Sequence, residues 1–229
     1  MNRLGSKYRM YKIKRLQHDT FVRSNLPYLP MLFEEVKAFM LHKLVKELPE
    51  TLTYHSINHV KDVYESAERL AEEEGIPEYE IRLLLTAALF HDSGFTVSPK
   101  GHEGLGCQIA RLHLPDFEYT EEEIMRICGM IMATMIPQTP TNLLEEIICD
   151  ADLDYLGRSD FPRVGNLLFK ELKDNNVVQT EEEWDLLQIK FLTQHHYFTA
   201  SAIRTRGPVK EMYLNYLKSL VKKDKNEVE

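Results

Sequence analysis

The sequence feature that most constrains the fold is an apolar run that ends in two ionisable residues. Leu83–Phe90 is apolar at nearly every position, and His91 and Asp92 follow it directly. A helix that is apolar on all sides is normally buried in a protein core. Such a helix would draw an imidazole and a carboxylate into the core, where burial costs several kcal/mol unless the groups are paired or bind a metal. We therefore predict a central helix that ends at a functional pair.

Helical periodicity continues along most of the chain. Apolar residues recur three and four positions apart, and Thr120 and Thr180, each followed three residues later by glutamate, have the pattern of a capping box. No segment alternates at period two, so we predict an all-α fold built as a single-domain helical bundle. The expected helices cover residues 31–48, 56–74, 77–90, 104–112, 121–135, 143–156, 161–172, 181–202 and 209–221.

The chain divides by charge. Between Arg3 and Arg15 it carries six basic residues and no acidic one, whereas the whole chain has a net charge of -8. We predict a basic N-terminal arm over residues 1–30, a helical domain over residues 31–222 and a tail over residues 223–229. The pI of 5.6 disfavours binding to a nucleic-acid backbone through the whole surface.

Composition also restricts the location of the protein and its chemistry. No stretch approaches the roughly 20 apolar residues of a membrane-spanning helix, and Met1–Arg15 lacks the apolar core of a signal peptide. We therefore expect a cytoplasmic protein without a membrane partner. Cys107, Cys128 and Cys149 are widely spaced, which predicts small buried thiols rather than disulfides or a zinc knuckle.

Three clusters carry residues able to do chemistry. They are the segment from Tyr54 to His59, the pair His91-Asp92, and the segment from Asp150 to Asp154 with its three aspartates. On a helix, His55 and His59 would project from one face, and either could bind a metal. Imidazole and carboxylate together suit Mn, Fe, Zn, Co or Ni, with Mg possible where carboxylate and water dominate. We therefore expect a divalent metal ion as cofactor.

The order of these clusters resembles the HD superfamily, in which a histidine, an adjacent His-Asp pair and a distant aspartate lie on helices. Tyr54-His55-xxx-His59 followed by Val63 is similar to the first metal motif of the cyclic nucleotide phosphodiesterase-like branch. The run from Ala87 to Asp92 resembles its second motif. Asp152 with the following leucine resembles the last ligand. The resemblance implies an HD-type helical bundle with the metal site in its core.

The resemblance also assigns roles. It implies His59, His91, Asp92 and Asp152 as metal ligands, with Asp150 in reserve, and His55 as the general acid. We hypothesise that Asp92 in addition orients the attacking water. His102 lies where several HD hydrolases carry a histidine that approaches the substrate phosphate or a second metal. Dinuclear members usually add a histidine where this chain has Thr134, which favours a single tightly held metal, or a second one held mainly by Asp92 and water.

The implied activity is metal-dependent hydrolysis of a phosphomonoester or phosphodiester by a metal-activated hydroxide. The expected partner is a small phosphorylated substrate of the nucleotide class, and a homo-oligomer is possible. Lys100, Arg158, Arg204 and Arg206 are candidate phosphate-binding cations, although each also fits a surface charge. Two alternatives remain open, an HD-type diiron oxygenase and a non-catalytic nucleotide-sensing module.

Overall fold

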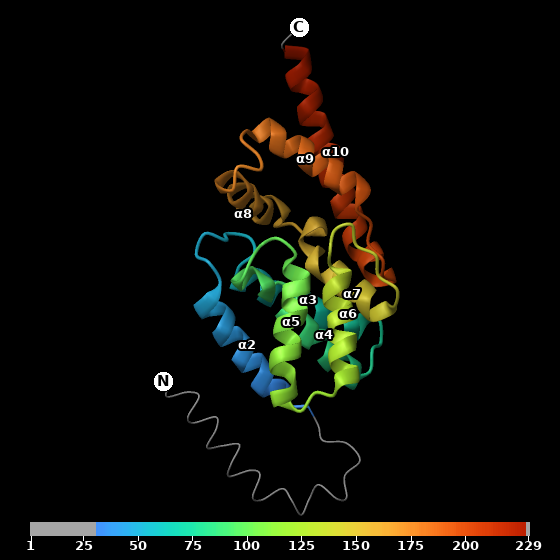
Figure 1. The fold of residues 1–229 in the computed structure, drawn as a ribbon. Helices are drawn as coiled ribbons and strands as arrows, with labels where there is room; N and C mark the ends of the chain where they lie inside the picture. Colours follow the sequence, from blue (N-terminus) through green and yellow to red (C-terminus); the bar gives the residue numbers. More distant parts are fainter. Residues whose placement is uncertain (1–30, 228–229) are drawn as a thin grey trace, which may run out of the picture. The chain divides into compact units, whose positions relative to one another are not determined.

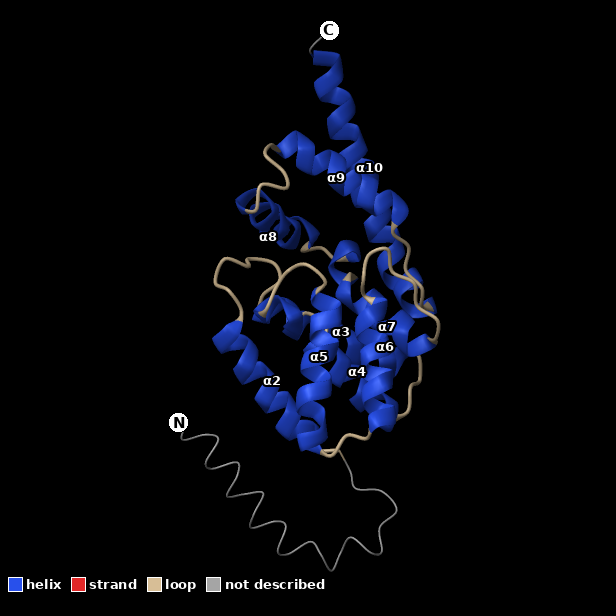
Figure 2. Cartoon of the chain, viewed as in Figure 1, coloured by secondary structure: helices blue, strands red, loops and turns tan. Residues whose placement is uncertain are grey.

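The computed structural model describes residues 31–227, and within it the chain from Leu32 onward forms one compact unit. All regular elements in these residues are helical and none is a strand, which confirms the all-α prediction (Figure 1, Figure 2). The elements are α2 (Phe33–Glu47), α3 (Ile57–Glu73), α4 (Glu78–Phe90), η1 (Ser93–Thr96), α5 (His102–His113), η2 (Leu114–Phe117), α6 (Glu121–Ala133), α7 (Leu143–Asp152), η3 (Asp154–Gly157), α8 (Phe161–Asp174), α9 (Glu181–Gln194) and α10 (Ala200–Glu227).

Helix α4 is the centre of a bundle formed by α2 to α7. It packs against α2, α3, α6 and α7, and every residue of Leu83–Phe90 is buried, as the apolar run predicts. Helix α3 packs on α7 as well as on α4, so the three helices that carry the His and Asp clusters adjoin one another. The three cysteines are buried and free, which confirms that prediction.

A second apolar cluster joins the C-terminal helices. Residues of η3, α8, α9 and α10 pack together in it, among them Leu156, Phe161, Leu192 and Leu214. Figure 1 shows α8 and α9 beyond one end of the α2–α7 bundle, with η3 between them and α7. This cluster forms a second packed layer next to the ends of α4 and α7.

The last two helices differ from the prediction. Helix α9 ends at Gln194, and α10 begins at Ala200 and continues through Pro208. The break comes early because the backbone N–H groups of Phe198 and Thr199 donate to the buried Asp150 carboxylate, at 2.9 and 2.8 Å. The Thr199 hydroxyl then accepts a hydrogen bond from the Ala202 N–H at 3.2 Å, as an N-cap does. The hydrogen bonds to Asp150, rather than Pro208, therefore set the boundary between α9 and α10.

The expected division into arm, domain and tail stays a prediction. The basic arm, residues 1–30, lies outside the described residues, as do residues 228–229. The backbone of residues 223–227 is the last part of α10. Within the described part of the chain, no helix combines the length and apolarity needed to cross a membrane.

Candidate metal centre

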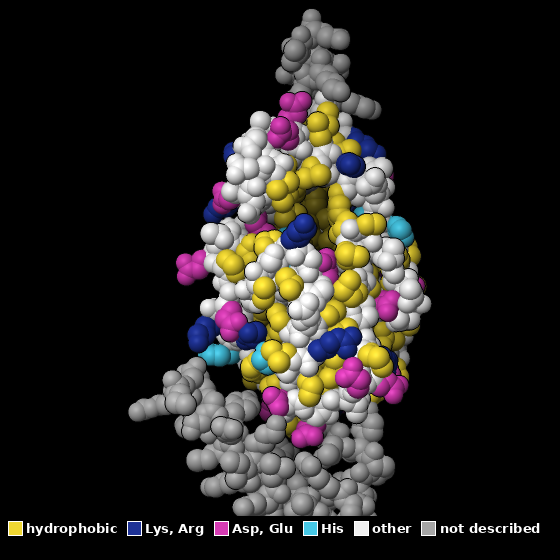
Figure 3. Space-filling model, in the orientation of Figure 1, with side chains coloured by type: hydrophobic (Ala, Val, Ile, Leu, Met, Phe, Trp, Pro, Cys, Tyr) yellow, Lys and Arg dark blue, Asp and Glu magenta, His cyan; other side chains and the backbone are white. Residues whose placement is uncertain are grey.

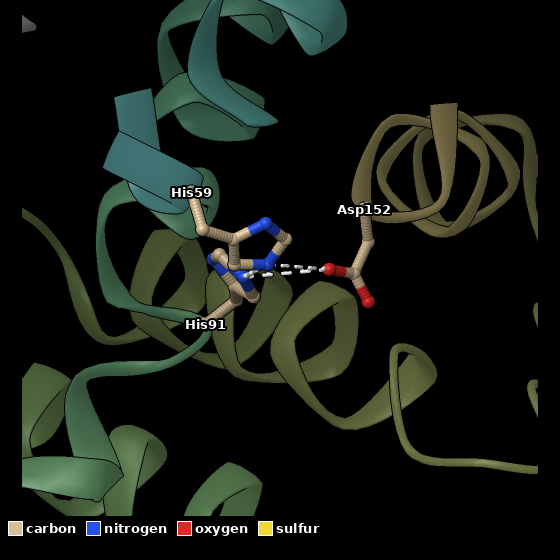
Figure 4. Close-up of side chains that lie close together, drawn as sticks. All are labelled: His59, His91 and Asp152. Carbon is tan, nitrogen blue, oxygen red and sulfur yellow. Dashed lines mark hydrogen bonds and ion pairs between the residues drawn. The ribbon is translucent and has the colours of Figure 1, made fainter. Parts of the chain in front are cut away.

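Three helices bring two histidines and two aspartates to one buried point. His59 is in the first turn of α3, His91 and Asp92 directly follow α4, and Asp152 is the last residue of α7. Figure 4 shows the rings of His59 and His91 side by side with the Asp152 carboxylate opposite them. Helix α7 ends here, earlier than the expected Leu156, and this end exposes the Asp152 carboxylate to the group.

The donor atoms lie at the spacing of ligands around one ion. The Nε2 atom of His59 is 3.1 Å from Asp152 Oδ1 and 3.4 Å from His91 Nε2. Asp92 Oδ2 lies 3.4 Å from His59 Nε2 and 3.3 Å from His91 Nε2. Two atoms each about 2.1 Å from one ion are about 3.0 Å apart at an octahedral angle and about 3.4 Å apart at a tetrahedral one. His59, His91 and Asp152 therefore have the spacing of ligands around one divalent ion, and Asp92 adjoins both histidines.

The neighbours of His91 and Asp92 support the same fit. His91 is 1% exposed, and its Nδ1 lies 2.8 Å from the carbonyl oxygen of Ala88, which accepts a hydrogen bond if Nδ1 carries the proton. That arrangement leaves the Nε2 lone pair directed at the group, as in many metal-binding histidines. Asp92 Oδ2 is buried and has no hydrogen-bond partner among the described residues. A buried carboxylate oxygen without a donor is expensive unless a cation meets it.

The pKa values of these two residues show how strongly the carboxylates polarise the site. Burial by itself lowers the pKa of His91, but Asp92 and Asp152 outweigh it and raise that pKa to about 9. Burial raises the pKa of Asp92, yet the imidazoles of His91, His55 and His59 outweigh burial and lower it. The cluster therefore attracts positive charge, here a proton and, in our interpretation, a metal ion.

The other two aspartates of the third cluster serve different purposes. Asp150 is fully buried and binds the Thr199 hydroxyl at 2.7 Å in addition to the two backbone N–H groups described above. Burial raises the pKa of Asp150 to about 6, although the hydrogen bonds from Thr199 and Phe198 act to lower it. Asp154 accepts hydrogen bonds from Arg69 at 2.7 Å and from Arg206 at 2.8 Å.

His55 reaches the same site from outside the helix. It lies two residues before α3 begins, so the expectation that His55 and His59 share a helix face is wrong, yet their ring centroids are 6.2 Å apart. The ring is held through Nδ1, which makes a short hydrogen bond to Glu171 on α8. Glu171 also accepts the backbone N–H groups of Tyr54 and His55, at 2.8 and 3.2 Å.

Glu171 sets the protonation of His55. Burial lowers the pKa of His55, but the hydrogen bond to Glu171 and the negative charges of Asp92, Glu171 and Asp152 outweigh it and raise that pKa. Sequence reasoning missed Glu171. The available signal was a glutamate next to the apolar stripe of α8, three residues after Leu168, and its 4% exposure shows that this position is indeed interior.

Phe95 and His102 complete this side of the site. The Phe95 ring stacks on His55 with a centroid separation of 4.3 Å, and His102 lies against Phe95 at 4.2 Å. His102 Nε2 is 3.5 Å from Asp92 Oδ1 and 3.4 Å from Glu103 Oε1. His102 is therefore at the edge of the group, next to the second carboxylate oxygen of Asp92.

Thr134 and most of the candidate cations are already engaged. The Thr134 hydroxyl, which borders the cavity beside the site, donates to the Ile131 carbonyl at 2.8 Å. Arg158 pairs with Asp62 and Asp160, Arg206 with Asp154, and Arg204 with Glu73. Lys100 is exposed on the loop before α5. The arginines that sequence reasoning considered for phosphate binding thus have acidic partners.

The comparison with protein families identifies the central part of the chain. Residues 56–154 match the family of the HD domain. This segment is an HD domain. It contains His59, His91, Asp92 and Asp152, whereas His55 precedes it by one residue and Glu171 lies beyond it on α8. No curated protein sequence gave a significant match.

Solved structures share the fold of the HD domain and the helices that follow it. A predicted HD superfamily hydrolase from an uncultured Thermotogales bacterium is 19% identical, with a TM-score of 0.56, over 81% of this chain and 91% of its own. Bacillus subtilis YpgQ is 18% identical, with a TM-score of 0.60, over 84% and 97%. The structure of YpgQ in complex with ADP is 20% identical, with a TM-score of 0.55, over 82% and 96%.

Proposed function

We propose that this chain is a divalent-metal-dependent phosphohydrolase that cleaves a small phosphate ester, with nucleotides as the first substrate class to test. The observation that carries the proposal is the close group of His59, His91 and Asp152 donor atoms, beside which Asp92 Oδ2 is buried without a hydrogen-bond partner in the described chain. In this proposal His59, His91, Asp92 and Asp152 hold the metal. A divalent cation there supplies Lewis acidity and makes hydroxide available at neutral pH.

The residues of the chain would provide orientation and a proton. Asp92 Oδ1, which lies 3.5 Å from His102 Nε2, would orient the attacking water. His55 uses Nδ1 on Glu171, so Nε2 is the atom that would donate a proton to the departing oxygen. The pKa of His55 is raised, which favours the protonated ring that a general acid requires. His102, whose ring centroid is 6.3 Å from that of His55, would approach the phosphate beside Phe95.

Nucleotides enter the proposal for two reasons. The first is the similarity of the Tyr54–Val63 and Ala87–Asp92 motifs to the cyclic nucleotide phosphodiesterase-like branch. The second is that YpgQ, which shares the fold, is known in complex with ADP. The two reasons support a panel of cyclic mononucleotides, nucleoside mono-, di- and triphosphates as a starting point.

The test compares the His55→Ala variant with the unsubstituted protein, each loaded with Mn, Fe, Co, Ni, Zn or Mg. We expect phosphate or nucleoside release from at least one substrate, and a loss of about 10²- to 10⁴-fold in the variant with unchanged metal content. His42→Ala, an exposed histidine on α2, is the matched control and should retain full activity. Normal turnover of a poor leaving group by His55→Ala would refute the role of His55.

The same samples separate the alternative functions. If the iron-loaded protein takes up oxygen and releases no phosphate, it is an HD-type diiron oxygenase and not a phosphohydrolase. If the protein binds a nucleotide tightly but releases no phosphate or nucleoside with any of the metals, it is a non-catalytic nucleotide-sensing module.

A further inference from the structure

We infer that the substrate carries a single phosphate and that the rest of it is uncharged and mainly apolar, because the phosphate site opens into an apolar chamber formed by η3, α8 and α9. The inference rests on the proposed phosphohydrolase activity and, within it, favours an apolar phosphomonoester over the nucleotides that were named as the first class to test. The chamber and the donor group share one cavity of about 290 Å³, lined at one end by Asp92, His102 and Asp152. At the other end its wall is made by Leu156, Phe161, Leu168, Trp184, Leu187 and Phe191.

The cavity is continuous between its two ends. Tyr54 and Tyr155 line it between the metal group and the C-terminal helices, and both are buried at 6% and 5% exposure. Tyr54 packs on the His59 ring at a centroid distance of 4.7 Å and on Tyr155 at 5.6 Å. A ligand whose phosphate meets the metal group therefore extends past these rings toward α8 and α9. Figure 3 shows the corresponding hollow with walls that are mostly hydrophobic.

The charges of the wall argue against a polyphosphate. No lysine or arginine lines the cavity in the described chain, whereas Asp92, Glu103 and Asp152 do. The arginines of this region are paired with acids, as described above, and the ammonium group of Lys210 contacts the backbone carbonyl of His195. A triphosphate needs cations or amide donors for each phosphate group. One phosphate can be met by one metal and His55, and further phosphates would face an apolar wall.

The size and polarity of the chamber define the organic group. A volume of about 290 Å³ corresponds to about ten water-sized groups. In ligand sites lined mainly by apolar and aromatic side chains, the few polar groups fix the orientation and specificity of the ligand. Beyond the tyrosines, the described residues of α8 and α9 add two polar groups to the chamber wall, the indole N–H of Trp184 and the amide of Gln188, which donates to Asp185 at 3.2 Å. An alkyl or aryl group fits this surface better than the ribose of a nucleotide.

The test measures binding of alkylphosphonates, whose P–C bond is not hydrolysed, to the Mn-loaded full chain by titration calorimetry. From methyl- to hexylphosphonate we expect the Kd to fall by about fourfold for each methylene that becomes buried. A Kd that does not change with chain length, or an ATP Kd below that of hexylphosphonate, overturns the inference.

Adjacent leucines on α9 provide matched variants. Leu187 lines the chamber and is 37% exposed, whereas Leu186 is 48% exposed and does not line it. Leu187→Glu and Leu187→Lys should both abolish the gain in affinity per methylene. Because lysine does not repel the phosphonate, the same loss in both variants shows that charge repulsion is not its cause. Leu186→Glu should keep the gain. If both Leu187 variants fold normally by circular dichroism and keep the gain in affinity, the apolar group does not bind in the chamber and the inference is wrong.

Hydrolysis assays with methyl and hexyl phosphate separate this inference from the proposed function. If the phosphonates bind with the expected dependence but no ester is cleaved, the chamber stands and the proposed function fails. If esters or nucleotides are cleaved at rates independent of the apolar group, the proposed function stands and the chamber inference fails.

Discussion

At the scale of single residues, Glu171 gives the clearest pH-dependent prediction. Its hydrogen bond and charge help raise the pKa of His55 against the lowering effect of burial. A proton donor with a raised pKa stays protonated to higher pH, so activity should fall only above that pKa. Glu171→Gln removes the negative charge, which should move the alkaline limb of the pH–kcat/KM profile to lower pH. Asp174→Asn, an exposed substitution on α8, is the control, and an unmoved limb in Glu171→Gln would contradict the coupling.

Asp152 and Asp150, two residues apart on α7, should separate metal binding from stability. Asp152→Asn is expected to weaken Mn binding by at least about 100-fold because it removes a charged donor atom from the group. Asp150→Ala should keep the metal affinity but lower the free energy of unfolding by about 1–3 kcal/mol, because buried N–H groups of residues 198–199 lose their acceptor. Titration calorimetry and urea denaturation measure the two effects. The reverse pattern would make Asp150 the ligand.

At the scale of elements, Gly94 tests the close packing of η1 on α5. A Cβ at Gly94 would lie 2.0 Å from the backbone oxygen of His102, so the two elements must separate. Gly94→Ala should therefore lower the free energy of unfolding by about 1–3 kcal/mol or more and reduce kcat/KM, since Phe95 and His102 move away from His55. Gly104→Ala, in open space within α5, should instead stabilise by about 0.5–1 kcal/mol. Equal effects in urea denaturation would refute the packing argument.

The helices were predictable wherever local sequence decides them. The apolar run Leu83–Phe90, the capping box at Thr120 and the left-handed Gly75 after α3 each fixed a boundary close to the observed one. The α9–α10 boundary was not predictable because it depends on Asp150, which is remote in sequence. Local propensity cannot report a hydrogen bond across 48 residues.

The same distinction applies to the candidate site. Sequence patterns named the residues that the structure gathers, namely His59, His91, Asp92 and Asp152, although their role as ligands stays a prediction. They missed Glu171 because its partner lies 116 residues earlier, and they missed the chamber because leucines and aromatics at helical spacing look like any core. Which apolar residues border a cavity depends on how helices pack.

At the scale of the whole molecule, the metal group connects three helices that are far apart in the chain. An ion that binds only the folded protein should therefore raise its stability, by about 2.7 kcal/mol at a concentration 100 times the Kd. For a chain of this size that gain corresponds to an increase of about 5–10 °C in Tm. Thermal unfolding against Mn concentration measures it. The increase should vanish in Asp92→Asn, and an equal increase in that variant would place the ion elsewhere.

The match to the HD domain ends at residue 154, where η3 begins, and the other two helices of the chamber wall, α8 and α9, follow from residue 161 onward. Bond cleavage and ligand choice would thus be encoded in consecutive, separately mutable stretches of the gene. A library confined to the wall positions of α8 and α9 would redirect such a protein toward new esters while the residues around the ion stay untouched. The exception on α8 is Glu171, which must be held constant because its carboxylate binds the His55 ring.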